Sequence, residues 1–143
     1  MRTKQPMALM FLDLDGLKRV NDTLGHAAGD GMIAEAAFVI RETFRSSDLI
    51  ARMGGDEFCV LFTAASHDVA EVALTRLEAA EAAANGQEGR RFTLSFSAGV
   101  AMFDPDDPCT LDQLIAIADE RMYARKRAKH APAEIVVALP LAL

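Results

Sequence analysis

The expected fold follows from one short stretch, Met53-Gly54-Gly55-Asp56-Glu57-Phe58, which joins two apolar segments. The flanking segments 49–52 and 58–62 are short, apolar and partly β-branched, which is typical of buried strands. The adjacent glycines can supply the positive φ angles of a tight hairpin, and they leave room for a ligand beside the backbone. The stretch therefore predicts a β-hairpin with two carboxylates at its tip. Considered alone, it is more simply explained as a structural turn, since Asp and Gly are ordinary turn formers.

The composition indicates one globular, acidic domain that spans residues 1–143. Hydrophobic residues make up 51% of the chain and charged residues 25%, which excludes a disordered protein. The 15 basic and 21 acidic residues give a net charge of −6, which argues against a non-specific nucleic-acid binder. A polyanionic substrate would need local cations or a bound metal to offset this acidity.

The cysteines and the hydropathy pattern predict a cytoplasmic protein. Cys59 and Cys109 lie far apart without metal-ligand spacing, so we expect two free thiols in a reducing compartment. Residues 1–6 contain no apolar core of a signal peptide, and no stretch approaches the roughly 18 apolar residues of a membrane span. We therefore expect no membrane contact from this chain.

The first half of the chain predicts a buried strand followed by two helices. The apolar run 7–12 indicates a strand that is buried on both faces and ends at Asp13, at a sheet edge that a ligand can reach. A short helix is expected over 17–24, closed by Gly25. A longer helix with apolar residues at helical spacing is expected to open at Asp30.

The second half predicts further helices and strands. Ser66 is expected to cap a third helix, and 92–102 alternates between apolar and small or polar residues, as a half-buried strand does. Thr110 and Gln113 form a capping box for the last helix, and 135–137 is expected to be an edge strand. The order β-α-α-β-β-α-β-α-β predicts an α+β fold with helices around a central five-stranded mixed or antiparallel sheet.

Three carboxylates, Asp13, Asp56 and Glu57, would converge if the first strand neighboured the hairpin. Clustered acids repel one another unless a cation neutralises them. Oxygen ligands without nearby His or Cys suit Mg²⁺ or Mn²⁺, and such sites commonly act on phosphates. The alternative is that the three acids are separate turn residues and helix caps, and the residues alone leave both interpretations open.

Several motifs in order resemble the GGDEF domain of bacterial diguanylate cyclases, over roughly Ala8 to Val137. The resemblance rests on Asp13-Leu14-Asp15-Gly16-Leu17-Lys18-Arg19-Val20-Asn21-Asp22, Gly25-His26-Ala27-Ala28-Gly29-Asp30, Gly54-Gly55-Asp56-Glu57-Phe58, the segment 97–101 and the segment 118–126. It implies a palm-like nucleotide-cyclase fold and a Mg²⁺-dependent homodimer that condenses two GTP into cyclic di-GMP and pyrophosphate.

The resemblance also implies roles for individual residues. The metal ligands would be Asp13, the Leu14 carbonyl, Asp56 and Glu57, and Asp56 or Glu57 would help remove the proton from the GTP 3′-hydroxyl. The implied substrate-binding residues are Asn21 and Asp30 for guanine, and Lys18, Lys126 and the backbone at Gly16 and Leu17 for phosphates. The plainer alternatives are a helix terminus for Asn21, an N-cap for Asp30 and solvated lysines.

Arg45 and Asp48 lie at the distance before Gly54 at which an RxxD motif forms an inhibitory product site in this family. An Arg fork can pair with guanine O6 and N7, and an Asp can accept from the other edge of the base. Arg76 matches a second arginine that some members use for the same ligand. An Arg and an Asp three residues apart also occur by chance in chains of this charge content.

Two departures from the family pattern bear on activity. The family normally has a helix with a DxLTGLxNR-like segment before the first strand, and this chain is expected to lack it. The family motif Gly-Arg-Asn reads Lys129-His130-Ala131 here, and His130, mostly uncharged at neutral pH, replaces an arginine that contacts phosphate. Residues 139–143 are expected to be a disordered tail.

Two other functions remain open at this stage. The chain could be an inactive GGDEF module that binds GTP or cyclic di-GMP and regulates a partner, such as a fused sensor or phosphodiesterase domain. It could also be a palm-like nucleotide cyclase with another specificity. The complete set Asp13, Asn21, Asp30, Asp56 and Glu57 favours the diguanylate cyclase.

Overall fold

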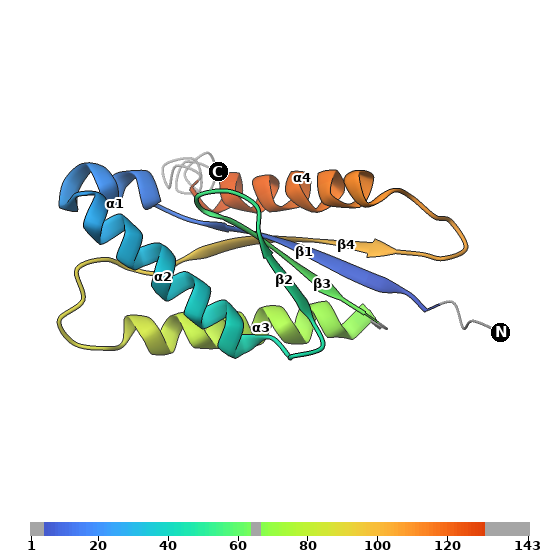
Figure 1. Cartoon of the computed structure of the whole chain (residues 1–143), viewed down its shortest axis with the longest axis horizontal. Coiled ribbons are helices and arrows are strands. Elements are labelled where there is room, and N and C mark those ends of the chain that lie inside the picture. The colour runs from blue at the N-terminus through green and yellow to red at the C-terminus, as the bar shows by residue number, and fades with distance from the viewer. Residues whose placement is uncertain (1–4, 64–66, 131–143) are drawn as a thin grey trace, which may run out of the picture.

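The structure, a computed structural model, describes residues 5–63 and 67–130. Its elements are, in order, β1 (Met7–Leu14), α1 (Leu17–Leu24), α2 (His26–Thr43), β2 (Leu49–Arg52), β3 (Glu57–Phe62), α3 (His67–Asn85), β4 (Phe96–Phe103) and α4 (Leu111–Lys129). Figure 1 shows the strands crossing the middle of the molecule, with α2 and α3 on one side and α4 on the other. The α+β layer arrangement predicted from the sequence is confirmed.

The described strands form one sheet in the order β2-β3-β1-β4, and every neighbouring pair is antiparallel. The prediction left mixed and antiparallel sheets open, and these strands are antiparallel throughout. The sheet has four strands over the described residues, whereas five were predicted. The predicted strand over 135–137, the predicted tail at 139–143 and the predicted cap at Ser66 lie outside the described residues.

β1 is buried on both faces, as predicted, because helices cover both sides of the sheet at its centre. Met10 and Leu12 belong to a large core shared with α1, α2 and α3, whereas Leu9 and Phe11 belong to a smaller core under α4. Burying each such side chain contributes roughly 1.5–3 kcal/mol. The odd-numbered residues of β1 therefore lie on the side of the sheet that α4 covers, and Asp13 is one of them.

The prediction that both hairpin strands are buried is wrong for β2, which is an edge strand with Leu49 61% exposed. The prediction of positive φ angles at Gly54 and Gly55 is also wrong. The loop 53–56 is longer than a two-residue turn and closes without a left-handed glycine. The Arg52 guanidinium donates hydrogen bonds to the Gly54 and Gly55 carbonyls, at 2.9 and 3.0 Å, and thereby stabilises this loop.

α2 begins at His26, so the prediction that Asp30 opens it is wrong. Gly25 has a φ of 92° and separates α1 from α2, and this sharp turn lets the second helix begin at once. Asp30 therefore lies in the second turn of α2 and is not its N-cap. The predicted role of Gly25 at the end of α1 is confirmed.

β4 begins at Phe96, four residues later than the predicted strand over 92–102, because its partner β1 ends at Leu14, opposite Phe96. The amide side chain of Asn85 pairs instead with the backbone of Leu94, through two hydrogen bonds of 2.8 Å. The prediction of a half-buried strand is also wrong, since Gly99 and Ala101 on the other face are buried beneath α4.

α4 begins with the predicted capping box between Thr110 and Gln113, and it packs closely on β4. A Cβ atom on Gly99 would lie 2.1 Å from the Ala118 carbonyl oxygen and 2.2 Å from the Met122 nitrogen. Helix and strand backbones therefore touch at Gly99, and only glycine fits there. Among the helices of the described part of the chain, none is long and apolar enough to cross a membrane.

Gly99→Ala should lower the free energy of unfolding by about 2–3 kcal/mol or more, because backbone atoms of α4 cannot yield as a side chain can. Gly31→Ala is the matched control, since Gly31 lies within α2 and an added Cβ meets nothing within 4 Å. It should stabilise the fold by about 0.5–1 kcal/mol. Urea denaturation measures both, and equal effects would contradict the close packing of α4 on β4.

Candidate functional site

Two acidic segments that are distant in sequence meet at one end of the sheet. In the antiparallel register of β1 and β3, Asp13 lies opposite Glu57. The Leu14 amide donates a 2.8 Å hydrogen bond to the Asp56 carbonyl, so the pairing extends into the hairpin loop. The convergence that the sequence left conditional is therefore present, and the adjacency of β1 and β3 produces it.

Asp13 is the most strongly perturbed acid of this cluster. It is 7% exposed, and burial raises the pKa of its carboxyl to about 6, with a further increase from the nearby Asp56 carboxylate. Lys126 on α4 opposes this increase by donating a hydrogen bond to Oδ2. Oδ1 is buried and has no hydrogen-bond partner in the described part of the chain.

The chemistry of these residues fits a hard divalent cation. Carboxylates at Asp13, Asp56 and Glu57, with the Leu14 carbonyl nearby, offer oxygen donors only, and the unpartnered Asp13 Oδ1 is free to serve as one. Within residues 5–63 and 67–130, however, no three acidic, His or Cys side chains are already arranged as a metal site. The positive charge next to Asp13 comes from the Lys126 ammonium, which forms an ion pair with Asp13 Oδ2.

Next to this cluster lies a polar network around Asp15 that was not predicted from the sequence. Asp15 is 6% exposed and accepts 2.9 Å hydrogen bonds from the hydroxyls of Ser95 and Ser97 and from the Lys129 ammonium. The signal available in the sequence was the second acid of Asp13-Leu14-Asp15 and the two serines at alternate positions before Gly99. Their proximity to Lys129 depends on tertiary structure.

The predicted nucleotide-binding residues occupy α1, α2 and the turn before them. Gly16 has a φ of 80° at the start of α1, Leu17 is half-buried, and Lys18 is exposed. Asn21 Oδ1 is buried without a hydrogen-bond partner among the described residues and abuts Gly29 of α2, where a Cβ would lie 1.7 Å away. Asp30, the residue that follows Gly29 in α2, is exposed. Gly29 thus leaves space for the Asn21 amide between the two helices.

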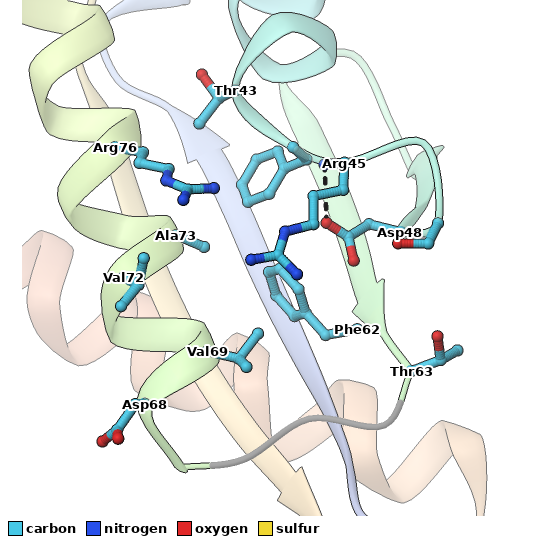
Figure 2. Close-up of a pocket in the computed structure, with 12 residues that line it drawn as sticks. Thr43, Arg45, Asp48, Phe62, Thr63, Asp68, Val69, Val72, Ala73 and Arg76 are labelled. Atoms are coloured by element: carbon cyan, nitrogen blue, oxygen red, sulfur yellow. Dashed lines mark hydrogen bonds between the residues drawn. The ribbon is translucent and has the colours of Figure 1, made fainter.

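Arg45, Asp48 and Arg76 line one pocket of about 160 Å³, with the buried Phe62 side chain beneath it. Figure 2 shows the Arg45 and Arg76 side chains extending toward each other from opposite sides of this pocket. The Arg45 amide donates a 2.9 Å hydrogen bond to Asp48 Oδ2, which fixes the short turn after α2. Phe62 ends β3 and Glu57 begins it, so the pocket and the acidic cluster lie at opposite ends of this strand.

Comparisons with known proteins show which family and fold this chain is similar to. The model of the family described as "Diguanylate cyclase, GGDEF domain" matches residues 1–131. Diguanylate cyclase DosC of Escherichia coli is 39% identical over 133 residues, a match that covers 88% of this chain and 27% of DosC. The chain thus spans about a quarter of that relative's length.

Two solved structures are similar over most of the chain. The GGDEF domain of TpbB from Pseudomonas aeruginosa has a TM-score of 0.77 and 36% identity, and the match covers 87% of this chain and 78% of that one. The GGDEF domain of DgcB from Caulobacter crescentus, in complex with c-di-GMP, has a TM-score of 0.73 and 30% identity, with 86% and 73% covered.

The raised pKa of Asp13 predicts a pH-dependent stability in the metal-free protein. The folded-state pKa of about 6 exceeds the ordinary aspartate value of 3.8, so the folded protein binds this proton more tightly, and that stabilisation is lost as pH rises through 6. The Asn side chain of Asp13→Asn stays neutral. The free energy of unfolding of this variant should therefore rise relative to that of wild type by up to about 3 kcal/mol between pH 4 and pH 7. Denaturation in EDTA measures this difference, with Asp22→Asn as an exposed control. A difference independent of pH would contradict the assignment.

Proposed function

This chain belongs to the diguanylate cyclase GGDEF domain family, and from that membership we propose that it condenses two GTP into cyclic di-GMP with release of pyrophosphate. One observation carries the proposal: Asp13 on β1 pairs directly with Glu57 at the start of β3. This pairing collects the acids needed for nucleotidyl transfer at one sheet end, beside the cationic end of α4.

Asp13, the Leu14 carbonyl, Asp56 and Glu57 would hold Mg²⁺ or Mn²⁺ in the working enzyme. The metal would lower the charge of the triphosphate and make the 3′-hydroxyl a better nucleophile. Asp56 or Glu57 would accept the proton that the hydroxyl loses, because both carboxylates lie in the loop and strand that face β1. The unpartnered Oδ1 of Asp13 supports its assignment as a ligand.

Asn21 and Asp30 would select guanine. The carbonyl oxygen of the Asn21 side chain is buried without a partner in the described structure, which is costly unless a ligand donates to it. Guanine presents N1–H and N2–H₂ as donors, and adenine lacks this pair. A site of unpaired acceptors should therefore discriminate strongly against ATP.

Lys126 and Lys18 would bind the β- and γ-phosphates. Burial lowers the pKa of Lys126, but the hydrogen bond to Asp13 and the negative charges of Asp13, Asp15 and Asp56 together raise it by more, so the ammonium stays charged. We infer that Lys126 moves from Asp13 to the phosphates when nucleotide and metal bind. His130 follows the last turn of α4 and would contribute less charge than arginine.

The reaction would require a two-fold homodimer. Each half-site would hold one GTP, and each 3′-hydroxyl would attack the α-phosphate of the other molecule, so a single domain has no partner to attack. Because the chain spans about a quarter of DosC, we infer that its parent protein carries further domains, such as sensor or phosphodiesterase domains. We also infer action in the cytoplasm, consistent with two free cysteines.

The pocket at the far end of β3 would bind the product and inhibit the enzyme. Arg45 and Arg76 offer two guanidinium forks to guanine O6 and N7, and Asp48 offers an acceptor to the other edge. The complex of DgcB with c-di-GMP supports product binding within this family.

A second candidate function is a module that binds GTP or cyclic di-GMP without turnover. Two observations favour it: the described acids are not arranged as a complete metal site, and His130 replaces a family arginine. The set of substrate-binding residues at Asn21 and Asp30 is nevertheless complete, and a retired catalytic site has little reason to keep it.

Incubation with GTP and Mg²⁺ should yield cyclic di-GMP, detected by chromatography. Glu57→Gln should reduce the rate by at least about 10²-fold, because it removes a candidate metal ligand and proton acceptor. Glu42→Gln, an exposed change on α2, is the control and should retain the rate. Absence of product at high concentrations of folded protein would exclude turnover by this chain. Retained GTP binding in that case would identify the non-catalytic module, and ATP competition would test the specificity.

Arg45→Ala should weaken cyclic di-GMP binding by about 10–100-fold while GTP affinity stays unchanged, because the guanidinium lies in the pocket remote from Asp13. Asp56→Ala should have the opposite effect. Calorimetric titration with each ligand separates the two sites, and Arg41→Ala provides an exposed arginine on α2 as control. Unchanged product affinity in Arg45→Ala would refute the product-site assignment.

A further inference from the structure

Among the described residues, the C-terminal part of α4 is held by lysines and not by buried apolar side chains. Met122 is the last buried residue of the helix, which continues to Lys129. Lys126 and Lys129, one turn apart on the same helix face, contact Asp13 and Asp15 at the end of β1. These two aspartates continue the row of odd-numbered β1 residues that faces α4. The position of this helical segment therefore depends on two lysine–aspartate contacts.

The Lys129 ammonium has a complete set of acceptors. It donates to Asp15 Oδ2 at 2.9 Å, to Ser95 Oγ at 2.7 Å and to the Phe96 carbonyl at 2.8 Å, which uses all three of its N–H groups. Its partner Asp15 is fixed independently by Ser97, which donates to both carboxylate oxygens at 2.9 and 3.1 Å. Lys129 thus ties α4 to the start of β4 and to the end of β1.

Lys126 is held much less tightly. Among the described residues its ammonium makes one hydrogen bond, to Asp13 Oδ2, and lies 3.9 Å from Asp15 Oδ1. Its side chain is 29% exposed and that of Lys129 is 42% exposed, so the two lysines differ in their hydrogen bonds and not in burial. An ammonium with one hydrogen bond can exchange its partner for a phosphate, whereas Lys129 would have to give up three.

We propose that Lys129 is a positioning residue: by tying the last turns of α4 to Asp15, it holds Lys126 where it reaches both Asp13 and the incoming triphosphate. This inference rests on the proposed function, because it assigns Lys126 to the phosphates. Without Lys129, the part of α4 beyond Met122 would keep only the single hydrogen bond of Lys126 to Asp13 as a side-chain hydrogen bond to the sheet among the described residues.

The test is a double-mutant cycle on nucleotide affinity. The probe is 3′-deoxy-GTP with Mg²⁺, which lacks the attacking hydroxyl and cannot turn over, and calorimetry measures its dissociation constant. Lys129→Met should weaken binding about tenfold, and Lys129→Arg should restore part of the loss because it retains charge and donors. In the Lys126→Met background, Lys129→Met should have less than about a twofold further effect, because Lys129 acts through Lys126.

Arg127→Met is the matched control, because it removes a charge from the exposed side of the same helical turn. Equal losses from Lys129→Met in both backgrounds would overturn the proposal, since they would mean that Lys129 binds nucleotide itself or only stabilises the fold. No loss in the wild-type background would overturn it as well. If Lys129→Met does not fold, Asp15→Asn with Lys129→Gln removes both charges together and should show the same dependence on Lys126.

A second measurement needs no nucleotide. The ¹⁵N signal of the Lys126 ammonium in the ligand-free protein reports its bond to Asp13, and it should shift or broaden in Lys129→Met but not in Arg127→Met. An unchanged signal would overturn the positioning role. If wild type failed to bind 3′-deoxy-GTP, the proposed function would fail, and the ammonium signal would still decide whether Lys129 positions Lys126.

Discussion

The antiparallel pairing of β1 with β3 is the constraint on which the candidate site depends. It sets Asp13 opposite Glu57 and brings the Leu14 amide to the Asp56 carbonyl. A shift of one residue in this register would turn Asp13 toward the core shared with α1, α2 and α3. β1 is apolar on both faces, so hydrophobic alternation alone does not select the register. The contact of Gly99 with α4 fixes instead how α4 lies on β4, the other strand that pairs with β1.

The same end of the sheet concentrates negative charge, which the protein balances with the basic end of α4. Asp13 is buried near Asp56, and without a cation this arrangement disfavours ionisation, as its raised pKa shows. Lys126 and Lys129 supply the compensation, one through a single hydrogen bond and the other through three. Lys126 can therefore exchange its partner, whereas Lys129 holds α4 in place. The burial of like charges at this end of the sheet is consistent with a functional site that is kept at some cost in folding stability.

Local patterns predicted the elements that local physics controls. The capping box at Thr110, the turn at Gly25 and the buried run over 7–12 were all recognised, because each depends on neighbouring residues. The predictions were wrong where contacts with a segment distant in sequence set the bounds or the burial of an element. β4 starts at Phe96 because β1 ends opposite it, and β2 is exposed because only β3 pairs with it among the described strands. The hairpin loop closes through Arg52 and needs no left-handed glycine at Gly54 or Gly55.

The sequence by itself determined the kind of protein: an acidic α+β domain whose spaced motifs identify the family and name Asp13, Asp56 and Glu57. Only the tertiary structure decided that Asp13 faces Glu57, that Lys126 and Lys129 hold different aspartates, and that Arg45 and Arg76 share a pocket. The physical reason is the distance along the chain over which each kind of interaction acts. Hydrophobic period, caps and turns act between neighbours in the chain, whereas strand register and charge pairing join residues that are distant in sequence, such as Asp13 with Glu57 and Asp13 with Lys126.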